Sequence, residues 1–217
     1  MLFQVIDNKD ECLGYYADDE ITIDQKVPES LFQTWTYSSI LSDRTDIEYA
    51  KLFCGGQSLD DVCPEDYVDR WAVINEKLKA YFRSFVEAKV SMDDNCFFQL
   101  VPSTFLQQYY EGRNKITKHV FEQYDRPDNY TFLVELSKMI AEISKQPINI
   151  DHTKLVDFMH TTAGRNFVNK IKRTNPYCKY NIFGTKTGRL STTKDSFPIL
   201  TMNKTYRSII RASNDFL

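Results

Sequence analysis

Apolar residues recur at helical spacing between residues 64 and 89, and this pattern restricts the chain to folds that contain long helices. Pro64, Glu65 and Asp66 form a typical helix start, with a proline in the first turn and acids at the positive helix end. The apolar positions that follow are Val68, Trp71, Ile74, Leu78, Tyr81, Phe82 and Phe85. Their steps of three and four residues predict one amphipathic helix over residues 64–89.

The residues before this helix have a different pattern, in which short apolar runs alternate with polar breaks. Residues 3–6 and 21–23 are expected to be strands, and the polar runs 8–10 and 18–20 end them. The pair Gly55-Gly56 predicts a turn. The chain therefore begins with strands and continues with helices, which predicts a mixed α/β (α+β) fold.

The rest of the chain is predicted to be mainly helical. Residues 96–100 are expected to form a buried strand, and three helices follow, at residues 102–123, 129–145 and 151–173. The polar run Asp125-Arg126-Pro127-Asp128 separates the first two of these helices. We therefore predict a mixed α/β domain over residues 1–127 and a second domain over residues 128–217, in which helices lead into an irregular basic segment.

The net charge of −3 conceals a strong asymmetry between the two ends of the chain. Residues 152–217 contain 12 Lys and Arg against 3 Asp and Glu, a balance of +9. Residues 1–151 contain 15 against 27, a balance of −12. An acidic body with a basic end indicates a nucleic-acid partner, although a solvated basic face without a partner has the same composition.

Cysteine usage and hydropathy indicate a reducing, cytoplasmic environment. The five cysteines are odd in number and include no C-x-x-C pair, so they predict neither a disulfide framework nor a zinc site. No run approaches the roughly 18 apolar residues that a membrane span requires. The first residues have the pattern of a strand rather than of a signal peptide.

Residues 180–194 combine the residue types that contact phosphate. Gly184 and Gly188 would let the backbone approach a ligand closely. Hydroxyl donors are Thr185, Thr187, Ser191, Thr192 and Thr193, and cations are Lys186, Arg189 and Lys194. The spacing does not match the P-loop motif. An extended track along a nucleic-acid duplex therefore fits this segment better than a nucleotide cradle.

The run Thr187-Gly188-Arg189-Leu190-Ser191 resembles the T-G-R-L-S signature of family A (bacterial polymerase-I-like) DNA polymerases. In that family the motif lies where thumb meets palm and holds the primer–template backbone. Residues 197–200 stand where the family has a proline–leucine segment, and Arg207 resembles the family arginine that reaches the minor groove near the primer end. The stretch between Arg189 and Arg207 is shorter than in the bacterial enzymes, and residues 199–203 replace a family Asn-Leu-Gln-Asn run.

The resemblance implies a thumb formed by the helices at 129–145 and 151–173, followed by the start of the palm. The residues expected to bind DNA are Thr185, Lys186, Thr187, Gly188, Arg189, Ser191, Thr192, Arg207, Lys172 and Arg173. For Lys172 and Arg173 two interpretations stay open, because cations at the end of a helix also interact favourably with its negative end.

The resemblance also implies a larger enzyme. Residues 214–217 resemble the turn that enters the first palm strand, and the aspartates that bind Mg²⁺ are expected beyond them. This chain would bind primer–template DNA without catalysing nucleotidyl transfer from deoxynucleotides. The palm and fingers would be supplied in cis or by a separate subunit. The small size and the altered motif suggest a phage or other viral enzyme acting in the cytoplasm of its bacterial host.

In family A the N-terminal position is usually held by an RNase H-like 3′–5′ exonuclease domain, whose two-metal chemistry needs clustered carboxylates. Asp7 ends the first predicted strand, but Lys9 stands where the second acid of an Asp-x-Glu pair is needed. The Asp-x-Glu pairs at 18–20 and 46–48 lie in polar surroundings. We therefore expect a degenerate exonuclease-type scaffold, which requires a central sheet within residues 1–125.

Two alternative functions, a DNA-binding accessory protein and a structural protein, would rely on the same basic segment. The chain would serve as a non-catalytic DNA-binding accessory module if the Thr187–Ser191 track acted without a catalytic partner. It would serve as a structural protein if its basic end bound another subunit. Phosphate binding weakens steeply as salt rises, which distinguishes these alternatives.

Overall fold

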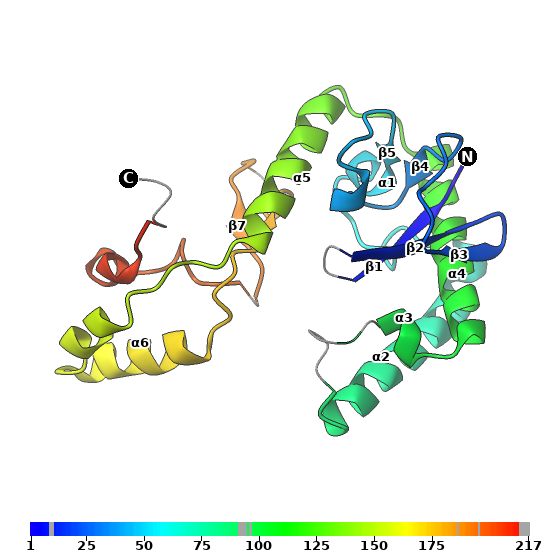
Figure 1. Ribbon diagram of the computed structural model, residues 1–217. Coiled ribbons are helices and arrows are strands. Elements are labelled where there is room, and N and C mark those ends of the chain that lie inside the picture. Colours follow the sequence, from blue (N-terminus) through cyan, green and yellow to red (C-terminus); the bar gives the residue numbers. More distant parts are fainter. Residues whose placement is uncertain (9–10, 91–94, 96, 186, 195, 213–217) are drawn as a thin grey trace. The chain divides into compact units, whose positions relative to one another are not determined.

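A computed structural model of the chain describes residues 1–8, 11–90, 95, 97–185, 187–194 and 196–212. The chain divides into two compact units, unit 1 over Met1–Glu135 and unit 2 over Leu136–Leu217 (Figure 1). The division falls within helix α5 (Tyr130–Lys145). Each unit has its own hydrophobic core, and the two are described separately below.

Unit 1 contains an antiparallel meander of strands β1 (Gln4–Asn8), β2 (Glu11–Ala17) and β3 (Glu20–Ile23). Asp18 and Asp19 connect β2 to β3 with φ of 49° and 63°. Positive φ at both central residues matches the twist of a two-residue hairpin, and aspartate tolerates this conformation better than most residues. The polar run predicted at 18–20 as a break is therefore a tight turn.

Two short parallel strands, β4 (Gln33–Thr34) and β5 (Glu48–Tyr49), form a second, two-stranded sheet. A parallel bridge joins Leu2 to Gln33, and the Phe3 N–H donates to the Gln33 carbonyl at 2.8 Å. Unit 1 thus contains two small sheets, the antiparallel β1-β2-β3 and the parallel β4-β5, which this bridge links.

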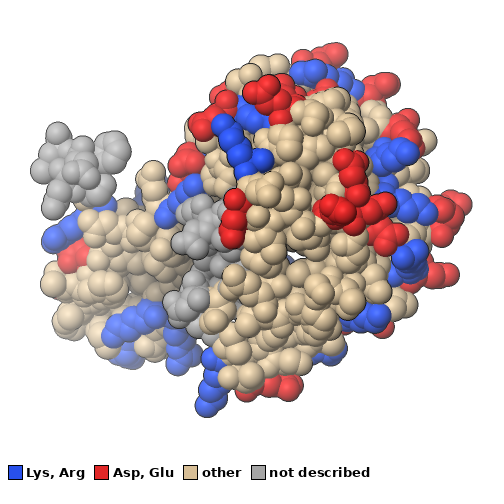
Figure 2. All heavy atoms as spheres, turned by 45° about the vertical axis from the view of Figure 1, so that its right-hand side comes forward, with Lys and Arg blue, Asp and Glu red and all other residues tan. Residues whose placement is uncertain are grey.

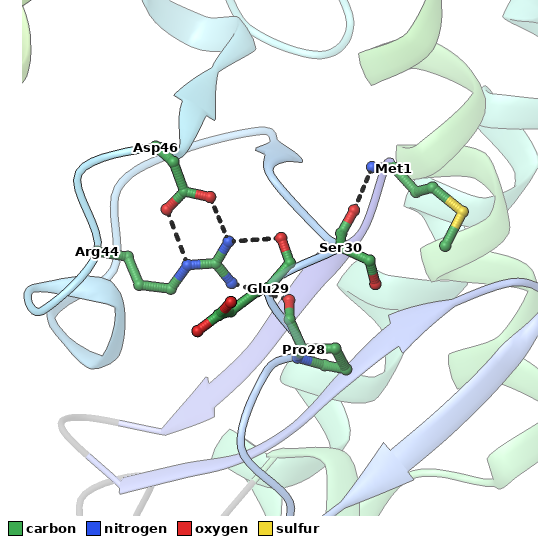
Figure 3. A network of polar contacts seen from close by, with 6 residues as sticks. All are labelled: Met1, Pro28, Glu29, Ser30, Arg44 and Asp46. Carbon is green, nitrogen blue, oxygen red and sulfur yellow. Dashed lines mark hydrogen bonds and ion pairs between the residues drawn. The ribbon is translucent and has the colours of Figure 1, made fainter.

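The loop before β5 is held by the guanidinium of Arg44 (Figure 3). Arg44 donates to both carboxylate oxygens of Asp46, at 3.0 and 2.5 Å, and to the carbonyls of Pro28 and Glu29, at 2.9 and 3.1 Å. The Met1 amino group donates to the Ser30 carbonyl beside them. This network fixes the crossover between β3 and β4, where no regular element would otherwise define the path of the chain.

Helices supply the remainder of unit 1. They are η1 (Ser39–Leu41), α1 (Ala50–Phe53), η2 (Glu65–Tyr67), α2 (Val68–Glu87), α3 (Phe97–Leu100) and α4 (Ser103–Gln123). Trp71 and Ile74 of α2 pack with Tyr110 and Ile116 of α4 in one core. The helices predicted at 64–89, 102–123 and 129–145 are confirmed, the first of them with a short 3₁₀ turn at its start.

The predicted strand at 96–100 is wrong, because Phe97–Leu100 forms the short helix α3. An apolar run of this length does not distinguish strand from helix by periodicity. Phe97 lies against the aromatic side chains of α2, with its ring centroid 4.8 Å from that of Phe82. Packing on a neighbouring helix, rather than pairing in a sheet, therefore decides the conformation of this segment.

Unit 2 contains the second half of α5 and small elements connected by irregular chain. These elements are η3 (Thr153–Phe158), α6 (Thr162–Arg173), the hairpin strands β6 (Tyr180–Asn181) and β7 (Ser191–Thr192), and η4 (Lys204–Ile209). Val168 and Ile171 of α6 pack with Phe197 and Ile209 in the core of the unit. Leu155, Cys178 and Met202 belong to the same core, so residues far apart in the sequence meet in it.

The predicted continuous helix at 151–173 is wrong, because the chain breaks between η3 and α6. Thr161 is the N-cap of α6, and its hydroxyl accepts from the Gly164 N–H at 3.0 Å. A β-carbon on Gly164 would lie 1.8 Å from the carbonyl oxygen of Phe158. The glycine therefore lets the two helical segments approach closely, which a continuous helix would not require.

Unit 1 and unit 2 both lack a membrane-crossing helix in their described parts, since no helix there has the necessary length and apolar character.

Candidate nucleic-acid interface

The T-G-R-L-S residues lie in and beside the loop of a β-hairpin. Strands β6 and β7 pair with Tyr180 opposite Thr192 and Asn181 opposite Ser191. Residues 182–190 connect the strands and carry Thr187, Gly188 and Arg189. A short hairpin thus presents the motif at its tip.

The two glycines of this hairpin are needed for different reasons. Gly188 has φ of +71°, and no atom would lie within 4 Å of an added β-carbon. Gly184 has no such backbone requirement, but an added β-carbon would lie 1.7 Å from the Ser191 hydroxyl oxygen. Internal packing therefore requires glycine at 184, whereas Gly188 bends the loop and leaves open space beside its backbone.

Some of the residues predicted to bind DNA form hydrogen bonds within the loop, and others are exposed to solvent. The Thr185 hydroxyl donates to the Arg189 carbonyl at 2.8 Å, and the Gly188 N–H points at the Thr185 carbonyl at 3.3 Å. Thr185 thus closes the loop with its own hydroxyl proton. Thr187, Gly188 and Arg189 are exposed, while Ser191 and Thr192 are half-buried in β7. Lys186, also predicted to bind DNA, lies outside the described residues.

The base of the hairpin is anchored in the core of unit 2. Phe197 is fully buried, and its N–H donates to the Tyr177 carbonyl at 2.9 Å. The Ser196 hydroxyl accepts from the Lys179 N–H at 2.9 Å, and the Thr193 N–H donates to the Lys179 carbonyl at 2.9 Å. These bonds fix both ends of the hairpin, so the exposed loop projects from a defined base.

The cations at the end of α6 are exposed. Lys172 and Arg173 occupy its last turn, where the structure leaves both side chains exposed. Across the described residues, no acidic side chain lies within ion-pair distance of Lys172, Arg173 or Arg189. These three cations are therefore available to an anionic partner.

Arg207 projects from η4, which aromatic packing attaches to α6. The ring of Tyr206 stacks on that of Phe167 with centroids 4.0 Å apart and planes 9° apart. Arg207 is exposed, and its Nε donates to the Met202 carbonyl at 3.3 Å. The start of its side chain is thus oriented by the backbone, while the rest of the guanidinium faces solvent.

A buried carboxylate, which the sequence analysis did not identify, holds the chain that follows Arg207. The Asp151 side chain is only 3% exposed, and its Oδ2 lies 2.5 Å from Nη2 of Arg211. Its Oδ1 accepts from the Thr153 hydroxyl at 2.6 Å and from the Thr153 N–H at 3.1 Å. The bonds from Thr153, followed by the nearby Arg211 charge, hold the pKa of Asp151 below its usual range. An Asp two residues before a Thr at a helix start is the signal that sequence reasoning could have used.

Backbone pairing strengthens the same junction. Ile150 and Ile210 form an antiparallel bridge, the Asp151 N–H donates to the Ile209 carbonyl at 2.7 Å, and the Arg211 N–H donates to the Asn149 carbonyl at 3.0 Å. Lys154 adds a bond from its Nζ to the Ser208 carbonyl at 3.2 Å. Residues 208–211 are therefore fixed to the start of η3, which positions Arg207 within unit 2.

The two units differ in the charge of their surfaces. On the face drawn in Figure 2, acidic and basic side chains are mixed over unit 1, and basic side chains gather on unit 2. Of the acids of unit 2 that the structure describes, Asp151 is paired with Arg211, and Glu142 lies 3.6 Å from Lys145. The described ranges bring together no group of three His, Cys, Asp or Glu that could hold a metal ion. The arrangement suits binding of an extended polyanion.

Comparison of the chain with protein-family models, with curated proteins and with solved structures finds no match.

Proposed function

We propose that unit 2 grips the sugar–phosphate backbone of primer–template DNA and that the chain is the thumb and palm-entry part of a family A-like DNA polymerase. The observation that carries the proposal is the hairpin tip, where Thr187, Gly188 and Arg189 are exposed on an anchored base. A hydroxyl and a guanidinium beside an open glycine backbone are typical partners of phosphate oxygens.

The positions of the other cations support the same role. Arg207 follows Tyr206, which is stacked on α6, and Lys172 and Arg173 lie in the last turn of that helix. Contacts of this kind position a protein on a duplex without reading its sequence. We therefore assign to unit 2 a sequence-independent grip, in which Arg189 binds the backbone and Arg207 approaches the duplex from η4.

We extend the proposal to unit 1, as a degenerate RNase H-like scaffold. This assignment is supported by the sheets of unit 1, the antiparallel meander β1-β2-β3 and the parallel pair β4-β5, which is bridged to Leu2 just before β1. The two acids of the Asp-x-Glu pair at 46–48 have structural partners. Asp46 is paired with Arg44, and Glu48 accepts from the Gln33 side chain at 2.9 Å. We therefore propose a scaffold without nuclease activity.

Nucleotidyl transfer itself is assigned to parts of the enzyme other than residues 1–217. The Mg²⁺ ions of a family A polymerase are held by palm aspartates, and the described part of this chain brings together no group of three His, Cys, Asp or Glu that could take their place. The chain's contribution is to bind and orient the duplex. The palm and fingers, which act on deoxynucleotides, would come from the same polypeptide or from a separate subunit.

Fluorescence anisotropy with a labelled primer–template tests the grip. Arg189→Ala is expected to weaken binding by about 3- to 10-fold in low salt, because one phosphate contact is lost, and to do so equally for different duplex sequences. Arg70→Ala removes an exposed guanidinium from unit 1 and serves as the matched control. Equal affinities of the Arg189→Ala protein and the wild type would overturn the proposed grip.

A separate experiment tests the polymerase assignment. The nucleic acid that encodes this chain is sequenced beyond codon 217. An apolar strand that ends in Asp, followed later by a Lys-bearing helix, is expected in the same frame or in a neighbouring one. If neither frame contains it while Arg189→Ala still weakens duplex binding, the chain is a DNA-binding accessory module and the polymerase assignment is wrong.

A further inference from the structure

A second nucleic-acid site is suggested by the surface of α2, far along the chain from the hairpin of unit 2. Residues 77–89 contain four cations and one acid, although residues 1–151 as a whole have an excess of acids. Lys79 and Arg83 are exposed, and the described residues place no acidic side chain within ion-pair distance of either. A local positive charge on an acidic unit attracts an anionic partner.

An aromatic side chain lies beside these cations. Phe82 is 42% exposed, although its ring is one of the larger apolar groups of unit 1. Phe97 of α3 lies parallel to it, with centroids 4.8 Å apart and planes 13° apart (Figure 1 places α3 beside α2). The edge of Phe85 approaches at 6.3 Å and 79°. One face of Phe82 is therefore supported by a second ring, while much of its area remains in solvent.

Helix geometry places Lys79 beside both the ring of Phe82 and the charge of Arg83 on the surface of α2. Phe82 is three residues after Lys79, and Arg83 is four residues after it, so Lys79 is a neighbour of both, with Cβ atoms about 5–6 Å apart, while Phe82 and Arg83 lie about 100° apart around the helix. A flat apolar ring flanked by cations matches a nucleic-acid base flanked by its phosphates. Bases in a duplex are already stacked on one another, so only a single strand offers a free base face.

We propose that Phe82, supported by Phe97 and flanked by Lys79 and Arg83, is a stacking site for single-stranded nucleic acid. The phosphates contact Lys79 and Arg83, and a base stacks on the exposed face of Phe82. This inference does not depend on the grip proposed for unit 2, because it rests on residues of unit 1 alone.

The test uses the full chain and a labelled oligo(dT) of about 12 nucleotides, within the usual site size for a single-strand-binding domain. Phe82→Leu keeps an apolar contact with Phe97 but removes the stacking surface. It is expected to weaken oligo(dT) binding at least fivefold while duplex binding stays unchanged. Phe82→Trp keeps a ring, retains the affinity, and introduces an exposed fluorophore whose emission stacked bases quench. Wild-type affinity in Phe82→Leu, or unquenched emission in Phe82→Trp, would overturn the proposal.

The cations are tested by the double substitution of Lys79→Ala with Arg83→Ala, which changes only exposed side chains. It is expected to weaken oligo(dT) binding and to lower the slope of log affinity against log salt by about 1 to 2, at roughly 0.7 per contact. Lys118→Ala, an exposed lysine of α4, is the matched control. If the double variant behaves like this control, the site is wrong. If Phe82→Leu instead abolishes a self-association detected by sedimentation and leaves oligo(dT) binding intact, this surface of α2 is a protein interface and the proposal fails.

Discussion

The carboxylate of Asp151 lies 2.5 Å from the guanidinium of Arg211 and joins the start of η3 to the segment that follows η4. The carboxylate is 3% exposed, whereas the guanidinium is 57% exposed. A buried charge needs such a partner, because leaving it unpaired away from water is costly. Because Arg207 directly precedes this segment, the Asp151–Arg211 pair helps to fix the position of Arg207, which we propose approaches DNA.

Replacing Asp151 is expected to destabilise unit 2. Asp151→Asn keeps one acceptor for Thr153 but removes the charge that faces Arg211. The pKa of Asp151 is lowered in the folded chain, so its contribution is present above the usual carboxyl pKa and is lost as pH falls through the folded value. Urea unfolding should therefore separate wild type from Asp151→Asn at pH 7 and much less in acid. The exposed Asp157→Asn is the control, and a difference that does not depend on pH would contradict this account.

Gly164 is expected to be the least replaceable residue of α6. Gly164→Ala puts a β-carbon 1.8 Å from the Phe158 carbonyl oxygen, which is backbone and cannot move aside cheaply. We expect a loss of at least about 2 kcal/mol in the free energy of unfolding. Asn166→Ala, an exposed position on the same helix, should change this free energy by no more than about 0.5 kcal/mol. Similar stability of the two variants would show that η3 and α6 are not packed as described.

Gly184 and Ser191 are expected to be coupled. The β-carbon of Gly184→Ala would lie 1.7 Å from the Ser191 hydroxyl oxygen, so the substitution should destabilise the hairpin. Adding Ser191→Gly removes the clash and should restore part of the stability. Thermal unfolding of the two single variants and the double variant measures this as a coupling energy of about 1 kcal/mol or more. Additive effects would mean that the two side chains do not compete for the same space.

The role of Lys172 and Arg173 is decided by the salt dependence of duplex binding. If they contact phosphates, Lys172→Ala and Arg173→Ala should each reduce the slope of log affinity against log salt by about 0.9. If they only stabilise the negative end of α6, each should cost about 0.3–1 kcal/mol of unfolding free energy and leave the slope unchanged. Lys118→Ala is the control for the loss of one exposed positive charge.

Tyr130→Phe is expected to destabilise unit 1 by about 1–3 kcal/mol, because the buried Tyr49 N–H would lose the hydroxyl that accepts from it at 2.8 Å. Burial raises the pKa of Tyr130 to about 12, so its neutral form stabilises the fold up to about pH 10 and this contribution is lost as pH rises toward 12. Guanidinium unfolding at pH 7 and pH 11 should show a smaller drop for Tyr130→Phe than for the wild type. Tyr124→Phe, at a half-buried tyrosine, is the control and should resemble the wild type at both pH values.

Much of the helical structure and the charge distribution follows from the sequence. The apolar spacing over 64–85, 103–123 and 130–145 is local, and the structure has helices there. The exposed Thr187-Gly188-Arg189 tip was predicted only as a phosphate-binding track, and its position on a hairpin came from the structure. The role predicted for Gly184 was incomplete, because the atom that fills its space belongs to Ser191.

The sequence by itself determined the helical periods, the tight turns at acidic and glycine pairs, and the segregation of positive charge toward residues 152–217, because each of these depends on neighbours in the chain. Only the tertiary structure decided the features that depend on distant partners. Gln33 of β4 bridges to Leu2, Phe97–Leu100 becomes a helix against α2, the segment 151–173 breaks at Thr161, and Asp151 meets Arg211. Each outcome depends on which groups become buried together, and that information is spread over residues far apart in the sequence.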